Sequence, residues 1–292
     1  MSLYSYKIFD AVAKHQSFIR AAESINLTPS AVSRSIATLE KTLGFRLFVR
    51  SRKGVRLTRE GESVIASIRS VLNAEEQLQQ LAAQINGLEQ GTVVIGTFSS
   101  VCSNWIPDII KSFRQLYPNI NIHIMQGDYE DVIHWTSVGI VDIGFASLPV
   151  SEDLIATPLF EDRLLCITPK NFKSKHPEFV TIDDIQNQTF VLQREGYNAD
   201  TISFIKKYNL TIQPEFFIDD DQSILAIVES GLGISVVPEL ILKKVSYDIK
   251  IYPLEPNEYR TIGLITQQKQ LLSPAAKKLF NHILDHVKNN IT

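Results

Sequence analysis

The sequence predicts an α/β protein in three parts: a small helical head that ends in a β-hairpin, a long linker helix, and a large domain in which strands and helices alternate. Three observations support this prediction. The chain has 292 residues, which is too many for one ordinary core. Apolar residues recur at helical spacing in the N-terminal part, whereas short apolar runs alternate with amphipathic segments beyond it. Basic residues are concentrated at the N-terminal end.

The composition, with 44% hydrophobic and 21% charged residues, is that of a globular protein. No stretch is long and apolar enough to span a bilayer, and the N-terminus lacks the apolar core of a signal peptide, so we expect a cytoplasmic protein. Residues 1–58 contain ten Lys/Arg and three Asp/Glu and are near +7, whereas the remainder is near −10. A basic head on an acidic body indicates a polyanionic partner for the head alone.

Three helices are expected in the head. Apolar residues at helical spacing predict the first, and Ser17 can cap a short second one. Thr28 and Pro29 suit the cap and first position of a third helix, which Gly44 ends as a left-handed C-cap. The outer face of this third helix is small, polar and cationic: Ser30, Ser33, Arg34, Ala37 and Lys41. Such a face can enter the major groove of DNA, although a merely solvated helix face is the alternative for the face taken alone.

Two short β-prone runs after the third helix flank a basic turn and predict a β-hairpin, which we call the wing. Four cations lie at or beside its tip: Arg50, Arg52, Lys53 and Arg56. A hairpin of this kind can bind phosphates or the minor groove. A winged helix-turn-helix is a far more specific sign of DNA binding than either part alone.

The head resembles the N-terminal signature of LysR-type transcriptional regulators. The match extends from Phe9 to Gly61 and includes the uninterrupted segment Leu27–Arg34. This resemblance implies sequence-specific binding to double-stranded operator DNA and transcription regulation. It also implies the residues that approach bases and phosphates, which are Pro29, Ser30, Ser33 and Arg34, and the wing residues Arg50 and Arg52. We place the DNA-binding domain at residues 1–58 and assign Lys53 of the wing to phosphate contacts.

A strict heptad repeat of apolar residues predicts the linker helix, residues 59–91. Glu75 is the one charged residue at these positions. Its apolar positions, at alternating spacings of four and three, are Val64, Ile68, Val71, Leu78, Ala82 and Ile85. The repeat predicts a two-helix dimer seam; an amphipathic helix lying on its own domain is the alternative. The resemblance agrees with a homodimer, because the family dimerises through such a helix, and it implies a homotetramer. A two-fold dimer requires two related DNA half-sites.

Residues 92–292 read as two similar sets of strands and helices. Strands are expected at residues 92–96, 120–124 and 141–145 in the first set and at residues 190–192, 215–218 and 234–238 in the second, with amphipathic helices between them. Such alternation predicts a parallel α/β sheet, and two sets predict two subdomains with a ligand cleft between them.

This large domain resembles the LysR-type effector-binding domain, whose two α/β subdomains resemble periplasmic binding proteins. The resemblance implies that the chain crosses near residues 148–161 and returns near Thr266. Subdomain I is then about 92–161 and 266–292, and subdomain II about 162–265.

The resemblance also implies an effector site lined by segments from both subdomains. The residues are Ser99, Ser100 and Cys102 before a helix starting at Ser103, Asp128 and Ser147 after two strands, and Gln193, Arg194 and Asn198 across the cleft. Hydroxyls and free N–H groups could hold an anion, and Arg194 favours one, whereas Asp128 favours an amine, so the charge of the effector stays open. Ordinary turn and capping chemistry is the alternative role of each residue.

Other chemistries have weaker support. His282 and His286 are four residues apart but have no third ligand nearby, and we expect no metal and no cofactor. Cys102 could be a redox sensor, but a small buried side chain is the better interpretation. Motifs of hydrolases, nucleotide-binding loops and zinc proteases are absent from the sequence, so we expect no enzyme. A transport-type solute-binding protein would share the large domain but not the basic head. RNA polymerase is a further candidate partner.

Overall fold

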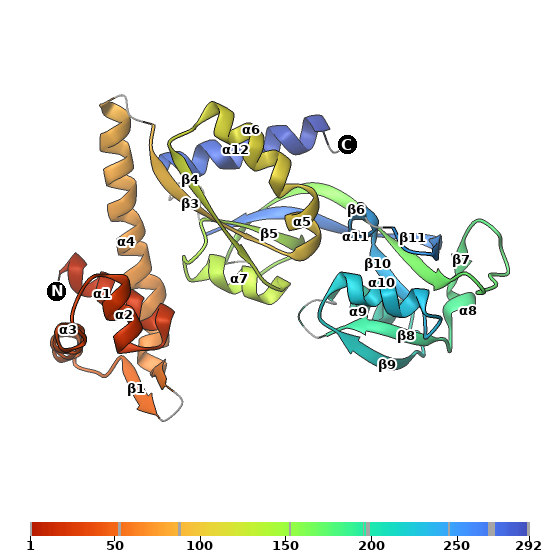
Figure 1. Cartoon of the computed structure of the whole chain (residues 1–292), viewed down its shortest axis with the longest axis horizontal. Helices are drawn as coiled ribbons and strands as arrows, with labels where there is room; N and C mark the ends of the chain where they lie inside the picture. The colour runs from red at the N-terminus through yellow and green to blue at the C-terminus, as the bar shows by residue number, and fades with distance from the viewer. Residues whose placement is uncertain are drawn as a thin grey trace.

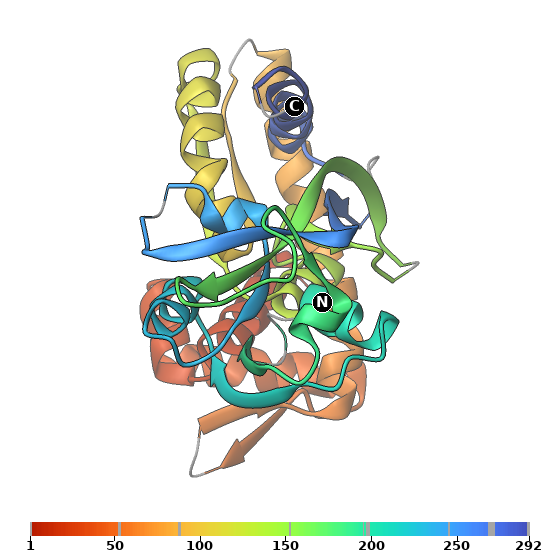
Figure 2. The same cartoon turned by 90° about the vertical axis from the view of Figure 1, so that its right-hand side faces the viewer.

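The structure is a computed structural model, and it describes residues 2–51, 54–86, 89–151, 153–194, 196, 199–244, 246–267 and 272–290. Figure 1 shows three bodies in a row: the head, the long helix α4 beside it, and the large domain with its two lobes. Figure 2 looks along the long axis from the second lobe, so the head lies behind it. Among the described residues, no helix is long and apolar enough to cross a membrane.

The head is three helices followed by a hairpin. Its elements are α1 (Leu3–His15), α2 (Phe18–Ser24), α3 (Pro29–Leu43), β1 (Phe48–Ser51) and β2 (Gly54–Leu57). The expected caps are confirmed: Ser17 accepts from the N–H of Arg20, and Thr28 accepts from the N–H of Ala31. Gly44 ends α3 with a φ of +85°, in the left-handed region that glycine adopts without strain. The core is formed by apolar side chains that include Phe9, Val12, Val32, Ile36, Leu39 and Leu47.

The linker helix α4 (Arg59–Ile85) begins at Thr58, whose hydroxyl accepts from the N–H of Gly61. Its first turns belong to the head. Ile68 is 6% exposed inside the head core, and Val64 packs against the same core. Both were expected in the dimer seam, and the structure places them within their own chain instead.

The apolar residues farther along α4 face outward. Val71, Leu78 and Ile85 are 44%, 67% and 80% exposed, and Leu81 joins them at 49%. Leu81 was not part of the expected heptad series, which passed through Ala82. These four side chains form an unpartnered apolar stripe in the single chain, here called the α4 stripe.

The large domain is built on one seven-stranded sheet with the order β10-β6-β11-β5-β3-β4, and β7 pairs with β11 beside it. Its longest members are β3 (Gly91–Thr97), β4 (Ile120–Gln126), β5 (Ile143–Leu148), β6 (Ile155–Pro169) and β11 (Ile249–Thr266). β3 is parallel to β4 and β5, but β11 is antiparallel to β5 and β6. The expected strands β3, β4 and β5 are thus parallel to one another, and the unexpected strands β6 and β11 make the sheet mixed.

The helices of the first subdomain cover both faces of this sheet. They are α5 (Ser99–Asn104), α6 (Ile106–Leu116), α7 (Tyr129–Ser137) and the C-terminal α12 (Pro274–Asn290). In Figure 1, α6 and α12 lie side by side above the sheet and α7 lies below it. The core between α6, α12 and the sheet contains Ile109, Phe113, Phe145, Leu279 and Ile283.

The second subdomain places helices against a small parallel pair of strands and the far ends of β6 and β11. Its elements are β7 (Val180–Thr181), α8 (Ile182–Ile185), β8 (Thr189–Gln193), α9 (Ala199–Lys207), β9 (Gln213–Ile218), α10 (Asp221–Glu229), β10 (Ser235–Pro238) and α11 (Glu239–Leu242). The strand pair β8-β9 is parallel, as expected.

Strands β6 and β11 carry the chain between the subdomains. In β11, Tyr252 and Leu254 lie in a core of the second subdomain, whereas Ile262 and Leu264 lie in the core of the first. The return therefore lies before Ile262, earlier than the expected position near Thr266. The reason is that one uninterrupted strand serves both cores, so no turn marks the boundary in the sequence.

Candidate functional sites: a basic head surface and a polar cluster between the subdomains

The N-terminal end of α3 presents a polar surface to solvent. Pro29, Ser30 and Arg34 are exposed and Ser33 is half-buried. The hydroxyls of Thr28 and Ser30 are 3.1 Å apart, and Arg34 Nε donates to the Ser30 carbonyl at 3.4 Å. Hydroxyls, a guanidinium and a positive helix end on one surface are the donors that bases and phosphates accept.

The wing contacts this surface. Arg50 donates to Ser33 Oγ at 3.0 Å, and its guanidinium carbon lies 4.3 Å from the ring centroid of Phe18. Stacking and hydrogen bonding fix the guanidinium at the junction of wing and α3. The expected wing residues Arg52 and Lys53 lie outside the described residues.

Replacing Arg34 with alanine is expected to weaken operator binding by about 1–3 kcal/mol, because one charged contact to base or phosphate is lost. The fold should be unchanged, since the side chain lies on the face of α3 opposite the head core. A gel shift at fixed salt measures the affinity, with Lys111→Ala on α6 as a control. Equal affinities for the two variants would show that Arg34 does not bind DNA.

A buried polar cluster lies between the two subdomains, centred on Arg260 of β11. Its guanidinium donates to Asp162 of β6 at 2.6 and 2.9 Å, to Tyr129 Oη at 2.5 Å and to Ser100 Oγ at 3.0 Å. The side chains of Arg260 and Asp162 are each 2% exposed. Asp162 also accepts from the N–H of Leu240. This pair joins the two crossing strands between the subdomains.

The ion pair keeps the side chains of Arg260 and Asp162 ionised. Burial by itself would lower the pKa of Arg260, but Tyr129, Asp162 and Asp200 raise it, so the guanidinium stays charged. Burial raises the pKa of Asp162, and the Arg260 guanidinium opposes that rise. A buried guanidinium that donates twice to one carboxylate oxygen and makes further hydrogen bonds can stay ionised away from water.

Direct hydrogen bonds join the two subdomains beside this pair. Asp200, in the first turn of α9, accepts from Tyr129 Oη and from Ser147 Oγ, both at 2.7 Å. The N–H of Tyr129 donates to the carbonyl of Gly196 at 3.3 Å. The two subdomains are therefore in polar contact in this conformation.

A second set of contacts lies beside the first. Gln193 Nε2 donates to Asp221 Oδ1 at 2.5 Å. Burial raises the pKa of Asp221, and a hydrogen bond from the Ser99 side chain, Arg260 and Gln193 lower it. Ser99 belongs to the first subdomain and Asp221 to the second, so the two subdomains also face each other here.

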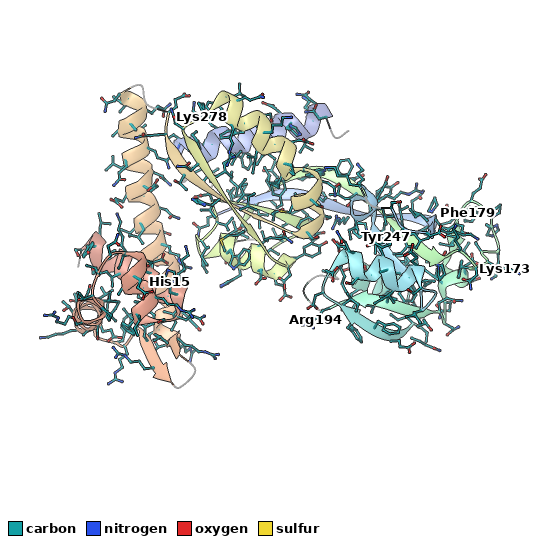
Figure 3. The ribbon with its side chains drawn as sticks, viewed as in Figure 1. His15, Lys173, Phe179, Arg194, Tyr247 and Lys278 are labelled. Atoms are coloured by element: carbon teal, nitrogen blue, oxygen red, sulfur yellow. The ribbon has the colours of Figure 1, made fainter. Side chains whose placement is uncertain are left out.

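The structure brings together Ser99, Ser100, Ser147 and Gln193 of the expected effector residues. Arg194 instead pairs with Asp219 at 2.8 Å, with 65% of its side chain exposed, and it lies at the edge of the second subdomain (Figure 3). Asp128 caps α7 by accepting from the N–H of Asp131. Asn198 lies outside the described residues.

Cys102 has a different setting from the one expected. Residues 98–102 were expected to form a loop before a helix at Ser103, but α5 begins at Ser99, so Cys102 lies on a helix. Burial raises the pKa of the Cys102 thiol, whereas redox-sensing thiols have a lowered pKa. Cys166 lies in a core of the second subdomain.

The two candidate metal ligands on α12 have other contacts. His282 Nε2 lies 2.8 Å from Ser112 Oγ, and its ring packs against Phe113. Burial and the neighbouring His286 lower the pKa of His282. Across the described parts of the chain, no three His, Cys, Asp or Glu residues lie together so as to hold a metal ion.

Sequence reasoning missed Arg260, Asp162, Asp200, Tyr129 and Asp221. Arg260 and Asp162 lie in the crossing strands, which were not predicted, and 98 residues separate them. Asp200 and Asp221 stand near helix starts, where an acid usually caps a helix. A weak signal was available for Tyr129, since it directly follows the predicted Asp128.

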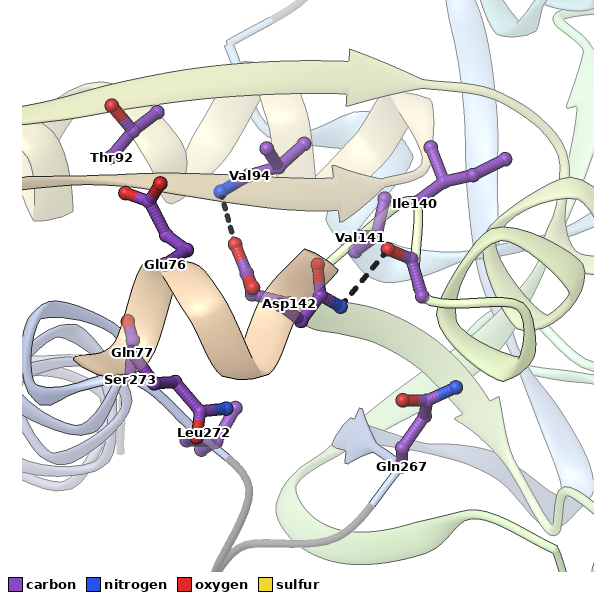
Figure 4. A pocket seen from close by; sticks show the side chains of 12 residues that line it. Glu76, Gln77, Thr92, Val94, Ile140, Val141, Asp142, Gln267, Leu272 and Ser273 are labelled. Atoms are coloured by element: carbon purple, nitrogen blue, oxygen red, sulfur yellow. Dashed lines mark hydrogen bonds between the residues drawn. The ribbon is translucent and has the colours of Figure 1, made fainter. Parts of the chain in front are cut away.

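A cavity of about 260 Å³ lies between α4 and the large domain and is lined by residues of both (Figure 4). Asn73 Nδ2 donates to the Gly139 carbonyl at 3.4 Å, and Asp142 accepts from the N–H of Val94 at 2.8 Å. Burial, with a smaller effect of Glu76, raises the pKa of Asp142 to about 6, while the Val94 hydrogen bond lowers it. The cavity is part of the contact between the linker helix and the large domain.

The raised pKa of Asp142 predicts a pH-dependent stability. Between about pH 4 and pH 6 the folded state binds more protons than the unfolded state, so stability falls as the pH rises through this window. Asp142→Asn should remove the part of that fall that Asp142 causes and stabilise the protein at neutral pH by about 2 kcal/mol, because an amide oxygen can still accept from Val94. Thermal melting across pH measures this, with Asp108→Asn, which changes an exposed acid, as a control. A variant that keeps the wild-type pH profile would contradict the assignment.

The head, the linker helix and the two-subdomain domain together define a class of protein: a DNA-binding regulator with a ligand-binding domain on the same chain. The comparisons with known proteins agree. Residues 3–62 match the family described as "Bacterial regulatory helix-turn-helix protein, lysR family", and residues 86–288 match "LysR substrate binding domain". The second match alone covers more than half of the chain, and the chain therefore belongs to the LysR family of transcriptional regulators.

Individual relatives support the same assignment. An uncharacterised HTH-type transcriptional regulator of Bacillus subtilis, YvbU, is 27% identical over 95% of this chain and 96% of its own. A full-length OxyR variant from Pseudomonas aeruginosa shares the fold at a TM-score of 0.79 and 21% identity, covering 99% of this chain and 95% of its own. The regulatory domain of Synechocystis CcmR, solved in complex with 2-PG, has a TM-score of 0.64 at 17% identity, covering 69% of this chain and 99% of its own.

Proposed function

We propose that this LysR-type regulator binds a two-part operator as a homodimer, or as a tetramer of two such dimers, and that a small-molecule effector binds in the cleft between its subdomains. The DNA-contacting residues are Pro29, Ser30, Ser33, Arg34 and Arg50, together with Arg52 and Lys53, which were expected from the sequence and lie outside the described residues. RNA polymerase is the partner that such a regulator would act on, and the cytoplasm is where it would meet operator DNA.

The observation that carries the proposed effector site is the polar cluster around Arg260. Side chains from both subdomains converge on it, and a ligand held there contacts both lobes at once. Buried polar groups with shifted pKa values in a cleft are the usual features of a binding site. The 2-PG complex of CcmR, a protein with a similar fold, supports a small-molecule role for this domain.

The test combines a gel shift with an effector titration. The full chain should shift the upstream region of its own gene at a lower concentration than random DNA, and the difference should persist at higher salt. Ser100→Trp should abolish any effector response yet spare DNA binding, because Ser100 lies on the Arg260 cluster and not in the head. Equal affinity for cognate and random DNA would overturn the proposed specificity.

A further inference from the structure

The carboxylate of Asp200 is bound by a subdomain other than its own. Asp200 belongs to α9 of the second subdomain, but its oxygens accept from Tyr129 and Ser147 of the first, each at 2.7 Å. Arg260 Nη1 lies 3.6 Å from Asp200 Oδ2. Two hydroxyls and a guanidinium thus converge on one carboxylate, which is the donor set that recognises a carboxylate ligand.

These three donors are held in place without Asp200. Tyr129 packs in the core of the first subdomain, with its ring 4.9 Å from that of Phe98 in an edge-to-face contact. Ser147 lies on β5, which pairs with β3 and β11. Arg260 is fixed by its two hydrogen bonds to Asp162. The site is therefore preorganised by the first subdomain and the crossing strands.

We propose that Tyr129, Ser147 and Arg260 form a carboxylate-binding site and that Asp200 occupies it as an internal ligand. The inference rests on the proposed function, in which the cleft is the effector site, and it adds the chemical class: the effector presents a carboxylate that takes the place of Asp200. Because Asp200 is tethered beside the site, it competes at a high effective concentration and lowers the apparent affinity of an external carboxylate. Exchange of one carboxylate for the other also frees the second subdomain from the first.

The acids around Arg260 suggest the competing possibility, a cationic ligand in place of a carboxylate. Asp162, Asp200 and Asp221 lie around a single guanidinium, so a cationic ligand would find acids on the crossing strand β6 and on the second subdomain. An amine would bind with Asp200 in place, whereas a carboxylate requires its removal. The two ligand classes therefore make opposite predictions for a variant that lacks Asp200.

The experiment is a thermal melt of the full chain in acetate, with chloride used to keep the ionic strength constant. In Asp200→Ala, acetate about tenfold above its dissociation constant should raise the melting temperature by about 2–4 °C. The wild type should show no comparable rise, because Asp200 fills the site. Asp219→Ala is the matched control: its acid lies in the same subdomain but pairs with the exposed Arg194. Acetamide, which lacks the charge, should have no effect on any variant.

Two further arms make the result specific. Adding Ser147→Ala or Tyr129→Phe to Asp200→Ala should remove the acetate effect, because each deletes one donor to the site. If Asp200→Ala does not fold in chloride, recovery of its circular dichroism in acetate alone is the expected result. A folded Asp200→Ala that responds to acetate no more than Asp219→Ala would overturn the proposal, and so would stabilisation of the wild type by methylammonium that Asp200→Ala loses.

The proposed function and the internal-ligand proposal can be rejected independently of each other. A gel shift without specificity would contradict operator binding and leave the acetate result unchanged, because the titration uses no DNA and no natural effector. Conversely, the protein could bind specific DNA and respond to an effector while Asp200→Ala shows no acetate effect. That result would support the proposed regulator function and reject Asp200 as an internal ligand.

Discussion

Replacing Arg260 with methionine is expected to destabilise the large domain by about 3–5 kcal/mol, because Asp162 would remain buried without its partner. Asp162 is 2% exposed and accepts two hydrogen bonds from the guanidinium, so water cannot take over that role without opening the cleft. The melting temperature should fall by about 10 °C. Thermal or urea unfolding followed by circular dichroism measures the change.

The matched control removes both charges. Arg260→Met combined with Asp162→Leu should recover most of the lost stability, since an apolar pair of similar size leaves no buried charge. Arg260→Lys should fall between the wild type and the methionine variant, because an ammonium keeps the charge but lacks the planar fork. The Arg260→Met defect should also shrink as the pH is lowered, because the unpaired Asp162 is then protonated in the folded state. If the single and double variants were equally unstable, the ion pair would not be the cause.

The head was the part of the fold most fully predicted from sequence, because its determinants are local. Thr28 and Pro29 start α3, Gly44 ends it, and the caps lie where the residue types demand. The helical period of the linker was equally clear. Its periodicity could not reveal that Ile68 packs into the head of its own chain, since that contact depends on how α4 is placed against α1.

The large domain was predicted only in part. Strands β3, β4, β5, β8, β9 and β10 were recognised because each is a short apolar or alternating run near turn residues. Strand β6 changes from exposed or half-buried side chains before Asp162 to buried ones after Leu164, so it shows no single period. With β6 and β11 missed, the pair that links them was missed as well. Ser99, Ser100, Ser147 and Gln193 could be placed only because the large domain resembles the LysR-type effector-binding domain, and not from the residue pattern itself.

Charged substitutions in the α4 stripe are expected to have the other large effect, on dimerisation and DNA binding. Val71→Asp combined with Leu78→Asp should convert the protein to a monomer, since Val71 and Leu78 are exposed in the single chain and two charges in a buried helix pair cost several kcal/mol. A dimer bound to two half-sites gains from linkage, so the monomer should bind the full operator about 10²- to 10⁴-fold more weakly. Sedimentation and a gel shift on the same preparation measure both quantities.

The control places two aspartates beside the stripe, at Ser70 and Gln79, both of which are exposed on α4. This variant carries the same added charge and should remain a dimer with nearly unchanged DNA binding. The fold of the head should survive in both variants, because its contacts with α4 involve Ile65 and Ile68 and not the stripe. A stripe variant that still sediments as a dimer and binds both half-sites would show that the chains pair through another surface, and the exposed α4 stripe would then need a different partner.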